Sequence, residues 1–234
     1  GSERMQNRPI EILVNALQDL GAQISYEDKV GYPPIRIKGT RIVKDKVQIN
    51  GNVSSQYISA LMLVASSLPN GLEIELLGKI TSVPYINMTL KLLHELGIDA
   101  TFIAHKISIK HFSVPVSKKG VVESDWSSAS YFYSCIALSD LKSQVVLSAY
   151  KKDSLQGDSC LSEIYKHFGV ETTFQDNTIT LTKVRKARED RLILDLKNAP
   201  DIAQTIAVTC FGLAIDCTLT GLHTLKIKET DRLV

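Results

Sequence analysis

The stretch PYINMTLKLLHELGIDATF, at residues 84–102, decides the fold because it joins a helical pattern to a short strand and recurs in the chain. The related stretches are PIEILVNALQDLGAQISY at 9–26 and SCLSEIYKHFGVETTF at 159–174. In the stretch at 9–26, apolar residues fall at i, i+3, i+4 and i+7, which is typical of a helix with one buried face. A repeated helix–strand segment therefore organises the sequence.

A glycine follows each of these helical patterns at the point where the helix is expected to end. Glycine favours the left-handed backbone conformation that closes many helices, so Gly21, Gly97 and Gly169 are predicted helix ends. These glycines are 76 and 72 residues apart, which sets the period of the repeat.

A second set of helical patterns interleaves with the first, at residues 53–67, 124–139 and 200–214. Each begins with or near a Ser or Asp, residue types that cap helix N-termini, and each has a nearly continuous apolar surface that predicts burial. A strand is expected before and after every one of them. The preceding strands are DKVQING at 45–51, GVVES at 120–124 and RLILDLKN at 191–198.

The repeating unit is therefore β-α-β-α-β-β over about 70 residues, which places the chain in the α/β class. Residues 46–113 form the clearest copy and 120–182 a second copy. Residues 191–234 begin a third copy, and 1–39 supply only the back half of an earlier one. A repeat that starts and stops in mid-unit indicates a piece of a longer chain.

This arrangement predicts two domains, 1–118 and 119–234, with a boundary near residues 113–124. The incomplete third copy should leave apolar surface exposed near residues 206–222, which makes self-association an expectation.

Composition gives no overall field that would attract nucleic acid or a membrane surface, because 27 basic residues face 25 acidic ones. The longest mainly apolar stretch, 57–68, is too short to span a bilayer. No basic-then-apolar leader opens the chain. Four cysteines without a CxxC pair predict buried, reduced thiols, and a cytoplasmic protein. The five histidines have no metal-ligand spacing, so no metal and no cofactor are expected.

Polar residues collect where strands give way to helices, and free backbone N–H groups at helix starts favour anions. The sets are Ser54, Ser55 and Gln56; Asp125, Ser127 and Ser128; and Asp201. Simple N-capping is the favoured explanation for any single one of these positions, but one cap needs only one side chain. The SSQ run therefore leaves phosphate or carboxylate binding at residues 54–56 as an open alternative.

The loops between the two helices of a unit add further candidates. These are Ser82, Tyr85, Lys228, Glu229 and Arg232, with Arg8 at the corresponding point of the first partial unit. Each cation could be an ordinary solvated surface charge, and Glu229 could belong to a plain ion-pair network. Equally, a carboxylate held between cations is suited to proton transfer beside a phosphate.

With these residues assembled, the chain closely resembles the 3-phosphoshikimate 1-carboxyvinyltransferase (EPSP synthase) family. The resemblance implies six β-α-β-α-β-β units in two lobes, of which this chain covers the middle. It is carried by ERMQNRPI, GYPPIRIKG, GNVSSQYISALML, SVPYINMTLKLL, ESDWSSASYF, SLQGD, APDIAQTIAV and LKIKETDRL. The family's N-terminal Lys-Ser-x-Ser-x-x-Arg loop and its late Arg and Lys residues are not in this sequence.

The resemblance implies a function for each candidate. Ser54, Ser55, Gln56, Ser82 and Tyr85 would hold shikimate 3-phosphate in the lobe formed by residues 1–118. Asp201 would accept the proton of its 5-hydroxyl, and Lys228 would bind and polarise that region. Arg8, Gln56 and Arg232 would contact phosphoenolpyruvate, and Glu229 would exchange a proton with its methylene carbon. Thr224 stands where many members have Asn. Asp125 matches a family position and is interpreted as a helix cap or a lobe contact.

Two alternatives stay open at this point. One is a non-catalytic anion-binding module of the same fold, and the other is a relative of the UDP-N-acetylglucosamine enolpyruvyl transferases. The combination SSQ…SVPY…KETDR favours the shikimate branch. Full-length members of the family are usually monomeric. A fragment without the missing cations is expected to be inactive by itself.

Overall fold

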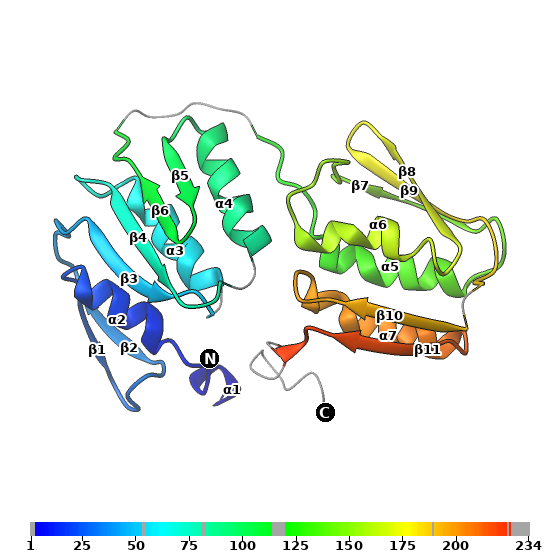
Figure 1. The fold of residues 1–234 in the computed structure, drawn as a ribbon, viewed down its shortest axis with the longest axis horizontal. Coiled ribbons are helices and arrows are strands. Elements are labelled where there is room, and N and C mark those ends of the chain that lie inside the picture. Colours follow the sequence, from blue (N-terminus) through cyan, green and yellow to red (C-terminus); the bar gives the residue numbers. More distant parts are fainter. Residues whose placement is uncertain are drawn as a thin grey trace. The chain divides into compact units, whose positions relative to one another are not determined.

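The computed structural model describes residues 3–52, 55–80, 83–113, 120–188, 190–223 and 225. The chain forms two compact units, whose described residues are those up to 113 in unit 1 and those from 120 onward in unit 2 (Figure 1). Each unit has its own sheets and its own buried cluster, and no sheet in the described ranges contains strands from both. The assignment of the units to two substrate-binding lobes stays a prediction.

Unit 1 combines a half repeat with one complete repeat. Its elements are α1 (Glu3–Gln6), α2 (Glu11–Asp19), β1 (Gln23–Tyr26), β2 (Ile35–Lys38), β3 (Lys46–Asn50), α3 (Ser55–Ala65), β4 (Leu72–Leu77), α4 (Val83–Glu95), β5 (Ala100–Ile103) and β6 (Lys106–Ile109). The elements from β3 to β6 follow the predicted order β-α-β-α-β-β.

The complete repeat of unit 1 folds as a four-stranded sheet in the order β3-β4-β6-β5. Strands β3 and β4 are parallel, and both β4 and β5 run antiparallel to β6, so β5 is parallel to β4. Helices α3 and α4 each connect two parallel strands and therefore run parallel to one another. Ile74 and Leu76 of β4 and Ile107 of β6 are buried. They form the core of unit 1 together with Ile58 and Leu61 of α3.

The half repeat, α2 with the antiparallel pair β1–β2, packs on this core through Ala16 and Leu20. The amphipathic pattern predicted at 9–26 is confirmed, since Val14 is buried and Leu13 and Leu17 of the same stripe are partly buried against the core.

Unit 2 contains the second repeat and the beginning of the third. Its elements are α5 (Trp126–Leu138), β7 (Gln144–Ser148), the short helices η1 (Gly157–Cys160) and α6 (Leu161–Ile164), β8 (Val170–Gln175), β9 (Thr178–Lys183), β10 (Arg191–Asp195), η2 (Pro200–Ile202), α7 (Ala203–Gly212) and β11 (Asp216–Thr220). Strands β7, β9 and β8 form one sheet, and the parallel pair β10–β11 forms another.

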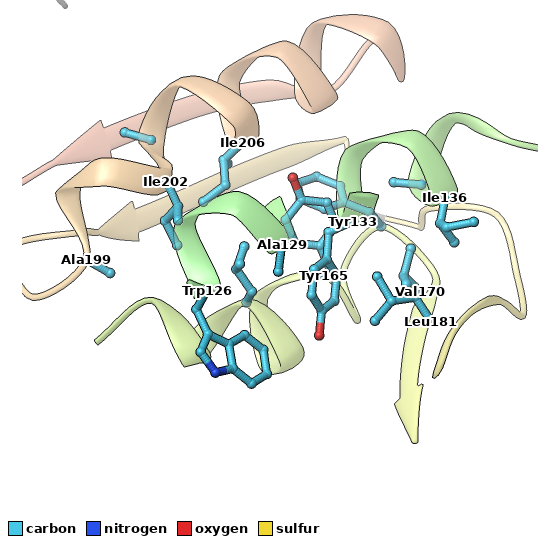
Figure 2. Close-up of a cluster of buried hydrophobic side chains, with 14 of the residues drawn as sticks. Trp126, Ala129, Tyr133, Ile136, Tyr165, Val170, Leu181, Ala199, Ile202 and Ile206 are labelled. Carbon is cyan, nitrogen blue, oxygen red and sulfur yellow. The ribbon is translucent and has the colours of Figure 1, made fainter. Parts of the chain in front are cut away.

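The core of unit 2 lies around α5, α6 and α7 and contains large aromatic side chains (Figure 2). Trp126, Tyr133, Tyr165 and Phe168 are fully buried. The Trp126 ring stands edge-on to Tyr150 with ring centroids 5.1 Å apart, and Tyr133 packs on Tyr165 at 5.0 Å. These rings fill space that branched aliphatic side chains fill in unit 1.

Two elements differ from the sequence prediction. Residues 120–124 do not form a strand; Ser124 N–H donates to Ala149 O at 2.7 Å, and its hydroxyl donates to Ser148 O at 3.0 Å. Side chains fix this segment in place of a strand ladder. The helix expected in 159–168 is reduced to α6, because the following residues make i→i+3 turn bonds such as Phe168 N to Tyr165 O.

The predicted helix ends are confirmed, because Gly21, Gly97 and Gly169 have φ angles of 106°, 85° and 78°. The expectation that Asp201 caps a helix is wrong: it is the second residue of η2, and the caps of η2 and α7 are Ala199 and Ile202.

The thiol prediction is also partly wrong. Cys210 is buried, but Cys135 and Cys217 are exposed; Cys217 lies on β11, a strand of a two-stranded sheet that leaves it open to solvent. Within the described ranges, no helix has the length and apolarity needed to cross a membrane.

Candidate functional site

Two helix starts meet at one edge of the unit 1 sheet. In the parallel pair β3–β4, Asn50 is opposite Leu77, so both strands end at the same edge. Gly51 N–H then donates to Leu77 O at 2.8 Å, which keeps the two outgoing connections together as they leave the sheet. Helices α3 and α4 begin a few residues later and direct their free N–H groups toward this edge.

A hydrogen bond between two hydroxyl groups fixes the axial position of α3 relative to α4. Ser59 Oγ and Thr89 Oγ1 lie 2.9 Å apart, and Thr89 Oγ1 also donates to Tyr85 O at 3.1 Å. Because α3 and α4 are parallel, the residues one turn earlier, Ser55 and Tyr85, stand at the same level. Ser55 is 8% exposed and Tyr85 is half-buried. The structure therefore places these two predicted residues at the same level of two adjacent helices, near the helix starts.

Arg8 is linked to the same helix start through its neighbour in sequence. The Tyr57 hydroxyl donates to Pro9 O, and burial raises the pKa of Tyr57 while the nearby Arg8 charge opposes that shift. Gln56, beside Tyr57 in α3, is exposed. The structure thus places the segment carrying Arg8 against the first turn of α3, next to Ser55 and Gln56.

Half of the candidate residues cannot be located in this way. Ser54, Ser82, Lys228, Glu229 and Arg232 lie outside the described residues, as does Thr224. Their positions in the site stay predictions.

In unit 2, the start of α5 is capped by Asp125, as the sequence predicted. Asp125 Oδ1 accepts from Ser127 N–H at 2.9 Å, and Oδ2 accepts from the Ser128 hydroxyl at 3.0 Å. The Ser127 hydroxyl donates to the buried carboxylate of Asp158, which belongs to η1. The polar residues at this helix start are therefore occupied with structural contacts.

Sequence reasoning missed a larger network just before α5. Glu123 Oε1 accepts from Trp126 Nε1 at 2.8 Å and from Lys151 N–H at 3.0 Å, and Glu123 Oε2 accepts from the Ser154 hydroxyl at 3.0 Å. Gln156 Oε1 accepts from Trp126 N–H at 2.9 Å. The signal was present in the motifs ESDWSS and SLQGD, whose polar residues join in space to anchor the approach to α5.

Asp201 lies at the start of α7, on the same side of unit 2 as the start of α5. The hydroxyls of Ser130 in α5 and Thr205 in α7 are 2.8 Å apart, and those of Ser134 and Thr209 are also 2.8 Å apart. Both pairs advance by four residues together, so the helices run parallel. One turn earlier in each helix, Asp201 is level with Trp126.

The two helix-start groups suit anionic ligands and proton transfer. The first has hydroxyl and amide donors with Arg8 nearby, and the second has a carboxylate at Asp201. In the described part of the chain, no three His, Cys, Asp or Glu side chains gather in a way that could hold a metal ion.

Comparison with known proteins gives one consistent family. The sequence model for EPSP synthase (3-phosphoshikimate 1-carboxyvinyltransferase) matches residues 1–234. The 3-phosphoshikimate 1-carboxyvinyltransferase of Bacteroides fragilis strain YCH46 is 44% identical over 233 residues, covering 100% of this chain and 56% of the relative. That of Pasteurella multocida strain Pm70 is 35% identical over 235 residues, covering 100% of this chain and 52% of the relative.

A solved structure of EPSP synthase from Acinetobacter baumannii superposes with a TM-score of 0.73 at 22% sequence identity. The match covers 99% of this chain and 53% of that one, and it confirms the predicted α/β repeat fold. The chain spans about half the length of the curated relatives that it matches.

Proposed function

The chain belongs to the EPSP synthase family, and we propose that it carries part of a site that transfers the enolpyruvyl group of phosphoenolpyruvate to shikimate 3-phosphate. The acceptor is the 5-hydroxyl, and phosphate is released. Because the chain spans about half of its curated relatives, the activity is proposed for a polypeptide of their full length. These 234 residues alone are expected to show no turnover, since cations that contact the transferred group would be missing.

The observation that carries this proposal is the level pairing of Ser55 and Tyr85 at two parallel helix starts. The two residues lie near the edge at which α3 and α4 begin, and their hydroxyls and the N–H groups of that edge would suit the phosphate and hydroxyls of shikimate 3-phosphate. Ser54 and Ser82 immediately precede these helices in sequence, and we assign them to the same ligand.

We assign the binding of phosphoenolpyruvate to Arg8, the cation beside the start of α3. Arg8 is held near the first turn of α3 by the Tyr57–Pro9 contact, and Gln56 is exposed on that turn. A guanidinium matches the geometry of a carboxylate or phosphate, so Arg8 would bind phosphoenolpyruvate together with Gln56 and Arg232.

The chemistry needs one group to accept a proton and another to donate one. Asp201 would take the proton of the 5-hydroxyl as its oxygen bonds to C2 of phosphoenolpyruvate, while Glu229 gives a proton to the methylene carbon. In the second step the bond from C2 to the phosphate oxygen breaks, phosphate leaves with the proton that Asp201 had taken, and the methyl carbon returns a proton to Glu229. Lys228 would polarise the reacting oxygen.

Titration calorimetry with shikimate 3-phosphate tests the unit 1 assignment directly. We expect binding to the chain at about millimolar Kd, or roughly −4 kcal/mol. Ser55→Ala and Gln56→Ala should each weaken it by about tenfold or more, since a lost hydrogen bond to a charged group costs roughly 1.5–3 kcal/mol. Ser67→Ala is the matched control, because Ser67 lies just beyond the opposite end of α3 and its hydroxyl donates to Val64 O.

The result that would contradict the assignment is unchanged affinity in both Ser55→Ala and Gln56→Ala. Equal weakening by Ser67→Ala would show that helix stability, and not ligand contact, is being measured.

A further inference from the structure

The interface between α5 and α7 contains hydroxyl groups where the core of unit 2 would accept apolar side chains. Ser130, Ser134, Thr205 and Thr209 are between 0% and 8% exposed. Apolar residues of the same two helices, such as Ala129 and Ile206, belong to the buried cluster of unit 2 (Figure 2). A buried hydroxyl is unfavourable unless it is hydrogen-bonded, so these side chains need specific partners.

The partners are one another, arranged as successive cross-links between the helices. Ser130 Oγ and Thr205 Oγ1 are 2.8 Å apart, and Thr209 Oγ1 lies 2.8 Å from Ser134 Oγ. Ser130 also donates to Ser127 O at 2.6 Å, so Thr205 donates to Ser130. The two cross-links have the same sequence separation, 75 residues, and therefore define a single register for the parallel pair.

A third segment joins these cross-links, and together they form a hydroxyl ladder of Ser130, Ser134, Thr205, Thr209 and Tyr165. Tyr165, the residue after α6, has its hydroxyl 2.9 Å from Thr209 Oγ1, and Thr209 Oγ1 is also 2.8 Å from Thr205 O. Burial raises the pKa of Tyr165 far above its ordinary value, so its proton stays available to donate. Thr209 Oγ1 accepts this hydrogen bond from the Tyr165 hydroxyl and directs its own proton toward its other partners, which fixes the direction of the bonds around it.

The ladder makes one axial position of α7 favourable over the neighbouring ones. Apolar contact is not directional, so a shift of α7 along α5 would exchange one set of apolar neighbours for another. The same shift would leave the hydroxyls without partners. The helices are also close at their other end, where a Cβ added to Gly212 would lie 2.6 Å from Leu138 Cδ2.

We propose that Ser130, Ser134, Thr205 and Thr209 are positioning residues, which hold Asp201 at the level of the α5 start by locking the register of α7. Asp201 lies one turn before Thr205, and η2 joins it directly to α7. A displacement of α7 along its axis therefore moves Asp201 by the same amount. The inference rests on the proposed function, since it matters for turnover only if Asp201 accepts the substrate proton.

Amide hydrogen exchange on the 234-residue chain tests the register lock without reference to activity. Thr209→Val keeps the side-chain shape and removes the hydroxyl, and we expect at least tenfold faster exchange for residues 201–205, with the β8–β9 hairpin unchanged. Thr209→Ser keeps the hydroxyl and should restore slow exchange. Thr172→Val is the matched control, because Thr172 bonds Tyr133 at 2.7 Å within unit 2 but does not contact α7 through that bond.

Three results would overturn the register lock. In the first, Thr209→Val speeds exchange in the β8–β9 hairpin as much as at residues 201–205. In the second, Thr172→Val also speeds exchange at 201–205, and in the third, Thr209→Ser does not restore slow exchange there. Unchanged exchange at 201–205 in Thr209→Val would overturn it as well.

Steady-state kinetics on the polypeptide of the relatives' full length tests the link to turnover. Thr209→Val should lower kcat about tenfold and leave KM for phosphoenolpyruvate within twofold, and Thr209→Ser should recover kcat. An unchanged kcat in Thr209→Val would overturn the positioning role. If Asp201→Asn also leaves kcat unchanged, the proposed function fails, while the exchange result still decides the register lock.

Discussion

Gly97 in unit 1 and Gly169 in unit 2 end equivalent helices of the repeat, but their surroundings differ. Both have left-handed backbones, with φ of 85° and 78°. A Cβ added to Gly97 would meet no atom within 4 Å, whereas one added to Gly169 would lie 2.0 Å from Arg185 O. The same local signal thus serves an open turn in one unit and a close backbone contact in the other.

The difference reflects how unit 2 supports a shortened helix. Val184 N–H donates to Gly169 O at 2.9 Å, and the Arg185 guanidinium donates to Lys166 O at 2.5 Å. Lys183, 4% exposed, donates through Nζ to Phe168 O at 2.7 Å. The end of β9 and the residues after it therefore satisfy carbonyls that a longer α6 would have bonded within itself. Unit 1 needs no such support, because α4 runs from Val83 to Glu95.

The largest expected effect comes from adding one methyl group at these two glycines. Gly169→Ala should lower the free energy of unfolding of unit 2 by about 3 kcal/mol or more, since left-handed strain and backbone overlap add. Gly97→Ala has the strain alone and should cost about 1 kcal/mol. Urea denaturation followed by tryptophan fluorescence reports unit 2 through Trp126, and circular dichroism reports both units. If both substitutions lower the free energy of unfolding by the same amount, the backbone at Arg185 moves away from the added methyl group at little cost.

A smaller effect is expected from alkaline pH, and it distinguishes the aromatic core of unit 2. Burial raises the pKa of Tyr165, so above pH 10 the unfolded chain releases this proton while the folded chain keeps it. The tyrosine therefore contributes nothing below pH 10, and above it stability falls by about 1.4 kcal/mol for each pH unit. Tyr165→Phe should remove that part of the slope in denaturation curves recorded between pH 9 and 11. If the free energy of unfolding falls equally steeply with pH in Tyr165→Phe and in the parent protein, the raised pKa of Tyr165 is not the cause of the loss.

The smallest effect concerns how helices begin in the two units. The side chain of Asp125 caps the N-terminus of α5. The N-cap residue of α2 in unit 1 is Ile10, which makes no side-chain cap bond. Asp125→Ala should destabilise unit 2 by about 1 kcal/mol, and Asp125→Asn, which keeps the acceptor oxygen, by much less. Thermal unfolding of the three proteins measures this. A loss in Asn as large as in Ala would indicate that charge, and not the cap bond, is responsible.

Local patterns predicted the repeat well because helix periodicity and terminal glycines act within a few residues. The complete repeat of unit 1 and the left-handed Gly21, Gly97 and Gly169 were all readable in advance. The strand expected at 120–124 was wrong, because the Glu123 side chain anchors that segment through contacts nearly 30 residues away. Periodicity carries no information about such contacts.

The candidate site shows the same division. Sequence identified Ser55 and Tyr85 as polar residues near helix starts, but their common level follows from the Ser59–Thr89 bond. The position of Asp201 likewise depends on hydroxyl pairs 75 residues apart. Residue types at helix starts are visible in a sequence, whereas the axial offset between two packed helices is a property of the tertiary fold.

The separate cores have a consequence for synthesis on the ribosome. The complete four-stranded sheet of unit 1 is contained between Lys46 and Ile109, and its strands pair only with one another. Once these residues have left the exit tunnel, the nascent chain holds every strand of that sheet, before the translation of unit 2 is complete. Unit 2 has to wait for β11, which ends at Thr220, to complete its parallel pair. Translation order therefore favours vectorial folding, in which the starts of α3 and α4 in unit 1 form while Asp201 is still unmade.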